Sequence, residues 1–171
     1  MKRLVFLIAS AVLISAGSYA QNWRVPSAQS FDQTMICLGE LDQPLTVELA
    51  DKPAQHARGL MQRESLGEFS GMLFRYPEVR NGDTGFWMYQ TLIPLDIAYL
   101  NQHQEIVKTF TMLPCGSDNP YNCRSYAPGK PYQFALEMNA GFFAEHDIRM
   151  GDKVTIVGQQ DAESSCHDIV Q

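Results

Sequence analysis

The stretch FWMYQTLIPLDIAYL, residues 86–100, combines a long apolar run with one proline, Pro94, and one carboxylate, Asp96. Proline cannot donate a hydrogen bond to a central ladder, so the run predicts two strands, Phe86–Tyr89 and Leu95–Leu100, separated at Pro94. An acid inside the second strand needs a partner, because burying an uncompensated charge is unfavourable. Asp96 is therefore either a satisfied structural carboxylate or part of a site.

The chain on both sides of this stretch also indicates short strands. We expect further strands at Thr46–Ala50, Gly71–Phe74, Glu105–Phe110, Tyr132–Met138 and Lys153–Val157. Two short helices are expected, one from Pro53 to Met61 with Asp51 as its cap, and one over Ala140–His146 capped by Asn139. This pattern predicts a mainly β (α+β) fold, a compact β-sandwich or barrel-like domain with one or two short helices.

The N-terminus has the order of a secretory signal peptide: a basic start, an apolar run, and small residues before Gln21. We expect cleavage after Ala20, no membrane anchor after cleavage, and a periplasmic or secreted protein. The predicted organisation is a signal peptide at 1–20 and an irregular extension at 21–44. A single β-rich domain at 45–157 and a polar tail at 158–171 complete it.

The composition argues against two classes of partner. The formal net charge is −6 and no run of lysine and arginine occurs. Nucleic acids and anionic membrane surfaces attract basic proteins, so we predict neither as a partner. The oligomeric state is not indicated by the sequence.

The four cysteines indicate disulfides, since an even number in an exported chain is typical of a disulfide framework. Cys115 and Cys123 flank a segment rich in turn-forming residues, so we expect these two to pair. Cys37 then pairs with Cys166. No Cys-x-x-Cys motif and no histidine at ligand spacing from a cysteine pair is present, so we predict no metal site and no cofactor.

Five blocks of residues occur in a recognisable order. They are Arg58-Gly-Leu-Met61-x-Arg63, Gly71-Met-Leu-Phe74, Phe86-Trp-Met88-x-x-Thr91-x-x-Pro94-Leu-Asp96, Leu136-Glu137-x-Asn139-Ala-Gly141 and Gly151-Asp152. Over residues 45–157 the chain resembles the domain of unknown function 192 family. The resemblance implies a compact, mostly β, single-domain protein that is often exported in bacteria. It implies no activity. The cysteine-bearing loop lies outside these blocks.

The polar and aromatic members of these blocks are the candidate site residues. They are Arg58, Arg63, Trp87, Thr91, Asp96, Glu137 and Asn139. One hypothesis is a structural ion pair, in which Arg58 or Arg63 contacts Asp96 or Glu137. The other is a pocket in which arginine binds an anionic ligand beside an apolar wall of Phe86 and Trp87. Of these two hypotheses we favour the structural ion pair. The function that we predict is a ligand-binding or structural module of the cell envelope.

Catalysis and copper binding are the weaker alternatives. Asp96 and Glu137 could act as acid and base groups while Arg58 and Arg63 bind an anionic substrate, but no hydrolase or metalloprotease motif supports this. Met61, Met72, Met88, Met112 and Met138 could bind Cu(I), yet methionines at apolar positions more often fill a core. The four histidines are expected to be solvated. The partner is thus an unknown small molecule or envelope component.

Overall fold

The computed structural model describes residues 24–157 and 165–169. The strands are β1 (Asp32–Leu38), β2 (Leu45–Ala50), β3 (Gly71–Arg80), β4 (Phe86–Trp87), β5 (Leu95–Leu100), β6 (Ile106–Met112), β7 (Ser125–Tyr126), β8 (Tyr132–Asn139) and β9 (Val154–Val157). The helices are α1 (Pro53–Arg58), α2 (Phe142–Glu145) and α3 (Cys166–Ile169), with a 3₁₀ helix, η1 (Pro120–Asn122). The signal peptide predicted at residues 1–20 lies outside the described residues.

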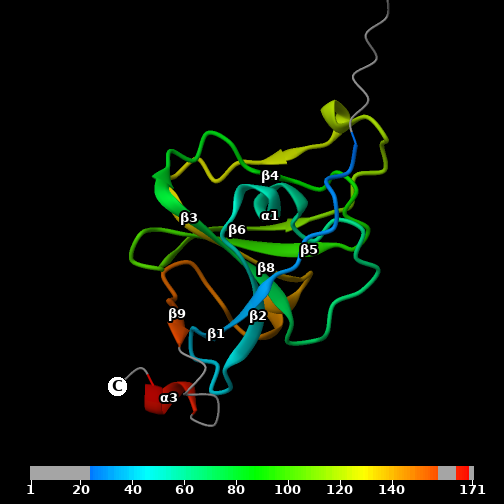
Figure 1. Ribbon diagram of the computed structural model, residues 1–171. Coiled ribbons are helices and arrows are strands. Elements are labelled where there is room, and N and C mark those ends of the chain that lie inside the picture. The colour runs from blue at the N-terminus through cyan, green and yellow to red at the C-terminus, as the bar shows by residue number, and fades with distance from the viewer. Residues whose placement is uncertain (1–23, 158–164, 170–171) are drawn as a thin grey trace, which may run out of the picture.

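One curled sheet carries the fold, in the strand order β6-β5-β8-β3-β2-β1-β9. Neighbouring strands are antiparallel except β2 and β3, which are parallel. The two edge strands of this sheet, β6 and β9, approach each other at one end. There Glu105 forms a β-bridge with Lys153, and the Ile106 N–H donates to the Asp152 carbonyl oxygen at 2.9 Å. The sheet is thereby bent into a half-barrel (Figure 1), which confirms the predicted mainly β, barrel-like class.

Two apolar clusters occupy the two faces of this sheet. The inner cluster draws residues from both edge strands, among them Ile106 and Val154, and therefore fills the inside of the curl. The outer cluster lies on the opposite face of β3, β8, β5 and β6, and includes Phe74, Ile97 and Tyr99. The helix α1 and the small β4–β7 ribbon lie on this side of the sheet, with the ribbon above α1 in the view of Figure 1. The central strands are thus buried on both faces.

The largest differences from the sequence-based expectations are in β1 and β3. Residues 32–38, expected to be irregular, form β1, which pairs with both β2 and β9. The strand beginning at Gly71 continues to Arg80, although Pro77 interrupts its register with β8. In both cases the strand is set by distant pairing partners, which a local pattern does not reveal.

The expected cap of α1 is also different. Asp51 does not cap the helix. Instead the Gln55 side chain reaches back and accepts hydrogen bonds from the backbone N–H groups of Asp51 and Lys52, each at 3.1 Å. Asp51 forms an ion pair with Arg75 at 3.0 Å.

Among the described helices, none is long and apolar enough to cross a membrane.

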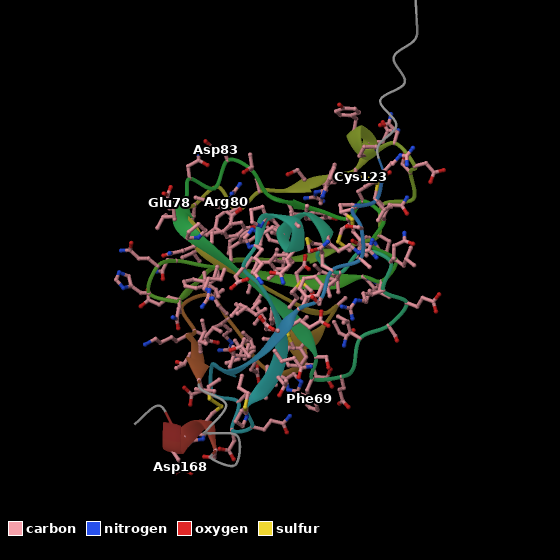
Figure 2. The ribbon with its side chains drawn as sticks, in the orientation of Figure 1. Phe69, Glu78, Arg80, Asp83, Cys123 and Asp168 are labelled. Atoms are coloured by element: carbon pink, nitrogen blue, oxygen red, sulfur yellow. A yellow bond between two sulfur atoms is a disulfide. The ribbon has the colours of Figure 1, made fainter. Side chains whose placement is uncertain are left out.

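Both predicted disulfides are present. Cys37 joins Cys166, which ties β1 to α3, the short helix in the segment predicted as a polar tail. Cys115 joins Cys123 and closes the loop that leads into β7. The two bridges lie at opposite ends of the molecule, as the positions of Cys123 and of Asp168 in α3 show (Figure 2).

Candidate functional site

A small pocket opens on the outer face of the sheet, where the C-terminal end of α1 approaches β4. Its volume is about 40 Å³. Its walls are residues 56–61, Phe74 of β3, Phe86 and Trp87 of β4, Thr91 and Glu137 of β8. We refer to it as the Glu137 pocket.

Glu137 reaches this pocket from the middle of the sheet. Its backbone partners are Met72 on β3 and Ile97 on β5, so the side chain stands between two apolar neighbours. The residue is only 4% exposed, and its carboxyl group forms no hydrogen bond or ion pair with any described residue. No fully buried side-chain oxygen of the described residues lacks a partner, so the carboxyl oxygens of Glu137 must reach the pocket itself. Burial raises the pKa of Glu137 to about 8. Near neutral pH this carboxyl is therefore largely protonated and can both donate and accept a hydrogen bond.

Thr91 places a second polar group on the pocket wall. The residue is 6% exposed, and its N–H donates to the Met88 carbonyl oxygen at 3.2 Å. Its hydroxyl has no partner within the part of the chain that the structure describes. Thr91 lies in the loop between β4 and β5. This loop is hydrogen-bonded to the segment after α1, because the Gln62 N–H donates to the Gln90 carbonyl oxygen at 2.9 Å. Thr91 is thus held in place by its backbone, while its hydroxyl stays available.

The end of α1 forms the side of the pocket. Gly59 ends the helix with a φ of 46°, and a Cβ at this position would approach the Phe74 ring to 3.3 Å. The Arg58 guanidinium does not reach a carboxylate; it donates to the Pro26 carbonyl oxygen at 2.7 Å. Arg58 therefore anchors the N-terminal extension beside the pocket and leaves Glu137 without a counter-ion.

Aromatic rings form the opposite wall. Phe86 contacts Phe74 edge to face, with ring centres 4.7 Å apart. The Phe86 N–H donates to the Tyr99 hydroxyl at 3.0 Å, and that hydroxyl donates to the Tyr126 carbonyl oxygen at 2.6 Å. This relay fixes the β4–β7 ribbon on the sheet. Trp87, 38% exposed, extends the aromatic wall toward solvent.

Asp96 belongs to the other face of the sheet. It pairs with Met138 of the inner cluster, whereas Glu137 pairs with Ile97 of the outer cluster, so the two acids point in opposite directions. Asp96 accepts hydrogen bonds from the Thr111 hydroxyl at 2.7 Å and from the N–H groups of Gly141 at 3.0 Å and Phe143 at 3.2 Å. It is a structural carboxylate that caps α2, a role the sequence analysis assigned to Asn139.

The predicted arginine–carboxylate pair exists, but with a different acid. Arg63 donates to both carboxylate oxygens of Glu48, at 2.9 and 2.7 Å. The pairing of Arg58 or Arg63 with Asp96 or Glu137 is therefore wrong. Asn139 is not in the pocket either, since its side-chain amide donates to the Gly67 carbonyl oxygen at 2.8 Å. The structure brings together Arg58, Trp87, Thr91 and Glu137.

The geometry also bears on the two weaker hypotheses. Asp96 and Glu137 cannot act on one substrate, because the sheet separates their carboxyl groups. Met72, Met88 and Met112 lie in the outer cluster and Met138 in the inner one, and all four are buried among apolar side chains. Met61 alone of the five lines the pocket.

His56 is a pocket residue that the sequence analysis placed on a solvated helix surface. Its ring lies against Tyr76, with centres 4.5 Å apart, and Nε2 is 3.0 Å from the Ala50 carbonyl oxygen and 3.1 Å from that of Arg75. A ring nitrogen between two carbonyl oxygens must carry a proton. The two carbonyls come from different strands, so no local sequence signal indicated this arrangement.

Comparison with known proteins identifies the family. Residues 35–156 match the DUF192 family, described as uncharacterized ACR, and the chain belongs to this family. Curated proteins gave no match. Among solved structures, a protein from Sinorhizobium meliloti 1021 (R01717), a suggested transcription regulator, is similar, with a TM-score of 0.64 and 27% identity. The match covers 76% of this chain and 98% of that one.

A second solved structure is a protein of unknown function from Novosphingobium aromaticivorans DSM 12444. It has a TM-score of 0.61 and 27% identity, and the match covers 80% of this chain and 96% of that one. These similarities establish the fold and the family, and they carry no activity with them.

Proposed function

We propose that this protein binds a small molecule, and that the Glu137 pocket is the binding site. The observation that carries the proposal is the buried Glu137 carboxyl, which has no partner among the described residues although it faces a cavity. No fully buried side-chain oxygen or nitrogen of the described residues lacks a partner, so the unpaired carboxyl oxygens of Glu137 must reach the cavity. A ligand group that enters the cavity would supply their hydrogen bond.

The dimensions of the pocket support an anchoring mode of binding. A cavity needs roughly 10–15 Å³ to hold one water molecule, so about 40 Å³ admits a functional group of a few heavy atoms. The group would contact Glu137 and Thr91 inside. The rest of the ligand would lie outside the opening, where Trp87 offers a partly exposed aromatic surface.

An enzyme is the second candidate, favoured by one observation. A carboxyl whose pKa is raised to about 8 is suited to exchange protons near neutral pH. Glu137 would act as a single general acid or base, because the other acid predicted for the reaction lies across the sheet. Binding is preferred, since it requires no second catalytic group.

Regulation of transcription, suggested for the similar Sinorhizobium protein, receives less support here. The chain has a formal net charge of −6, and phosphate binding requires clustered lysine and arginine. An envelope location is supported by the two disulfides, which persist in oxidising compartments. N-terminal sequencing of the exported protein, expected to begin at Gln21, tests this location.

The test of binding is a fragment screen followed by protein NMR on wild type and two variants. Fragments that bind should shift the resonances of Trp87 and Thr91. Glu137→Gln and Thr91→Val preserve side-chain volume while altering the polar groups, so each should weaken these fragments by about tenfold, the equivalent of roughly 1.4 kcal/mol. Glu48→Gln, a carboxylate outside the pocket, is the matched control and should bind like wild type. Fragments that bind all four proteins equally would overturn the proposal.

A further inference from the structure

We infer that the group anchored in the Glu137 pocket is a protonated amine, so that the ligand is a small molecule bearing an alkylammonium group. The inference rests on the proposed binding function and adds the chemistry of the ligand. It is drawn from the hydrogen-bonding groups and rings that line the pocket and from the way in which the nearby cations are already engaged.

The residues that line the pocket bring several hydrogen-bond acceptors. Glu137 contributes two carboxyl oxygens and Thr91 a hydroxyl. The carbonyl oxygens of His56 and Ala57, at the end of α1, accept no hydrogen bond from any residue in the described part of the chain. An ammonium group has three donors and no acceptor, and therefore complements this set. An anionic group would instead face Glu137 and the negative end of a helix.

The apolar part of the pocket is aromatic. Phe74, Phe86 and Trp87 line it together. Aromatic faces attract cations through their quadrupole, by about 0.5–1 kcal/mol at exposed sites and about 2 kcal/mol when desolvated. A carboxylate beside aromatic rings is thus a suitable combination for an ammonium group.

The cations near the pocket do not neutralise Glu137. The Arg58 guanidinium is engaged by the Pro26 carbonyl oxygen. His56 directs Nε2 toward two backbone carbonyl oxygens, at 3.0 and 3.1 Å, and forms no ion pair with Glu137. The other titratable groups on this side are Tyr76 of β3 and Tyr99 of β5, and burial raises the pKa of both hydroxyls, so they stay neutral. The charge of an ionised Glu137 is therefore left for a ligand to compensate.

Binding then includes a proton transfer to solvent. In the empty pocket the Glu137 carboxyl keeps its proton up to a pKa of about 8. When the ammonium group enters, this proton leaves as H⁺ and the carboxylate pairs with the cation, whose own protons are retained. Below about pH 8 the affinity for an amine should therefore rise nearly tenfold for each pH unit. A ligand that accepts a hydrogen bond from the protonated acid would show the opposite trend.

The experiment compares three compounds of one size: n-butylammonium, 1-butanol and butyrate. Each is titrated into the full-length mature protein, at about pH 6 and about pH 8, and binding is followed by NMR at Trp87 and Thr91. We expect n-butylammonium to bind about tenfold or more tightly than either analogue at the higher pH, and to lose affinity at the lower one. Glu137→Gln should abolish both the preference and its pH dependence, while Glu48→Gln should keep both.

The possible results separate the inference from the function on which it rests. If 1-butanol or butyrate binds the pocket at least as well as n-butylammonium, the ammonium inference is wrong and the pocket remains a binding site. If none of the three binds, the ammonium inference is likewise wrong, and the fragment screen decides the function independently. Should Glu137→Gln fail to fold, the wild-type pH series is sufficient, because an affinity for n-butylammonium that does not rise with pH refutes the inference.

Discussion

Asp96 and Glu137 are two buried acids on neighbouring strands of the same sheet, and their surroundings are opposite. They are 3% and 4% exposed. Asp96, on the inner face, accepts one hydroxyl and two backbone N–H groups. Glu137, on the outer face, has no partner among the described residues and faces a pocket. Burial is therefore the same in both cases, and only the set of partners distinguishes a structural carboxylate from a candidate functional one.

A third acid extends the comparison along the outer face. The register places Glu48 beside Met72, and Met72 beside Glu137, so the two glutamates lie in one row with a methionine between them. Glu48 is paired with Arg63, whereas Glu137 is not paired. The chain thus supplies a cation for one glutamate of the row and leaves the other facing the cavity.

The largest effect is expected from the titration of Glu137. The unfolded chain releases this proton near its ordinary pKa of 4.5, whereas the folded protein holds it to about 8. Between these values the unfolded state binds fewer protons, so the free energy of unfolding should fall as the pH rises. The contribution lost from this group between about pH 4 and about pH 9 is on the order of 5 kcal/mol. Urea unfolding at a series of pH values measures it.

The variant Glu137→Gln isolates this contribution. It cannot ionise, so it should match wild type at about pH 4 and be the more stable protein at about pH 9. A difference between the two proteins that does not change with pH would show that Glu137 is not held protonated in the fold.

The next largest effect is expected at Asp96. Asp96→Ala removes three hydrogen bonds to a carboxylate, from Thr111, Gly141 and Phe143, and leaves the buried Phe143 N–H unsatisfied, which should lower the free energy of unfolding by about 3 kcal/mol. Denaturant unfolding is the measurement, and Asp118→Ala, at an exposed position, is the control. If Asp96→Ala unfolded like the control, the contrast between the two buried acids would disappear.

The smallest effect is expected at Glu48. The side chains of Arg63 and Glu48 are 37% and 26% exposed, and ion pairs of this kind contribute less than about 1 kcal/mol. Glu48→Gln should therefore change the free energy of unfolding only slightly. A loss comparable to that of Asp96→Ala would show that the exposed Glu48–Arg63 pair stabilises the fold as much as the buried Asp96 does.

Strands with a clear local pattern of apolar residues were predicted from the sequence. Strands that depend on pairing with distant segments were missed. The bounds predicted for β5 are those observed, and β2 begins one residue earlier than predicted. The strand β1 was missed because its stability comes from β2 and β9. The strand β3 was predicted to end at Phe74, whereas pairing with β8 extends it to Arg80.

The sequence also predicted only part of the candidate site. Four of the polar and aromatic residues that it singled out share the pocket: Arg58, Trp87, Thr91 and Glu137. The hydrogen-bond partners of Asp96 could not be predicted, because the two N–H groups that donate to it lie 45 and 47 residues farther along the chain. An alternating pattern also suggests one wet face, while the central strands here are covered on both faces. An arginine was expected beside Asp96 or Glu137, whereas Arg58 contacts Pro26 and Arg63 contacts Glu48.

The meeting of the first and last strands of the sheet has a consequence for the protein in a crowded solution. Edge strands can recruit the edges of other molecules and so begin aggregation. Here the start of β6 is joined to β9 through Glu105 and Lys153, which removes part of each edge from reach. Along the rest of β6, Lys108 extends over the Phe110 ring, with 5.0 Å from its ammonium nitrogen to the ring centre. A lysine at this position places a charge where an incoming strand would have to dock, which favours a protein that remains dispersed.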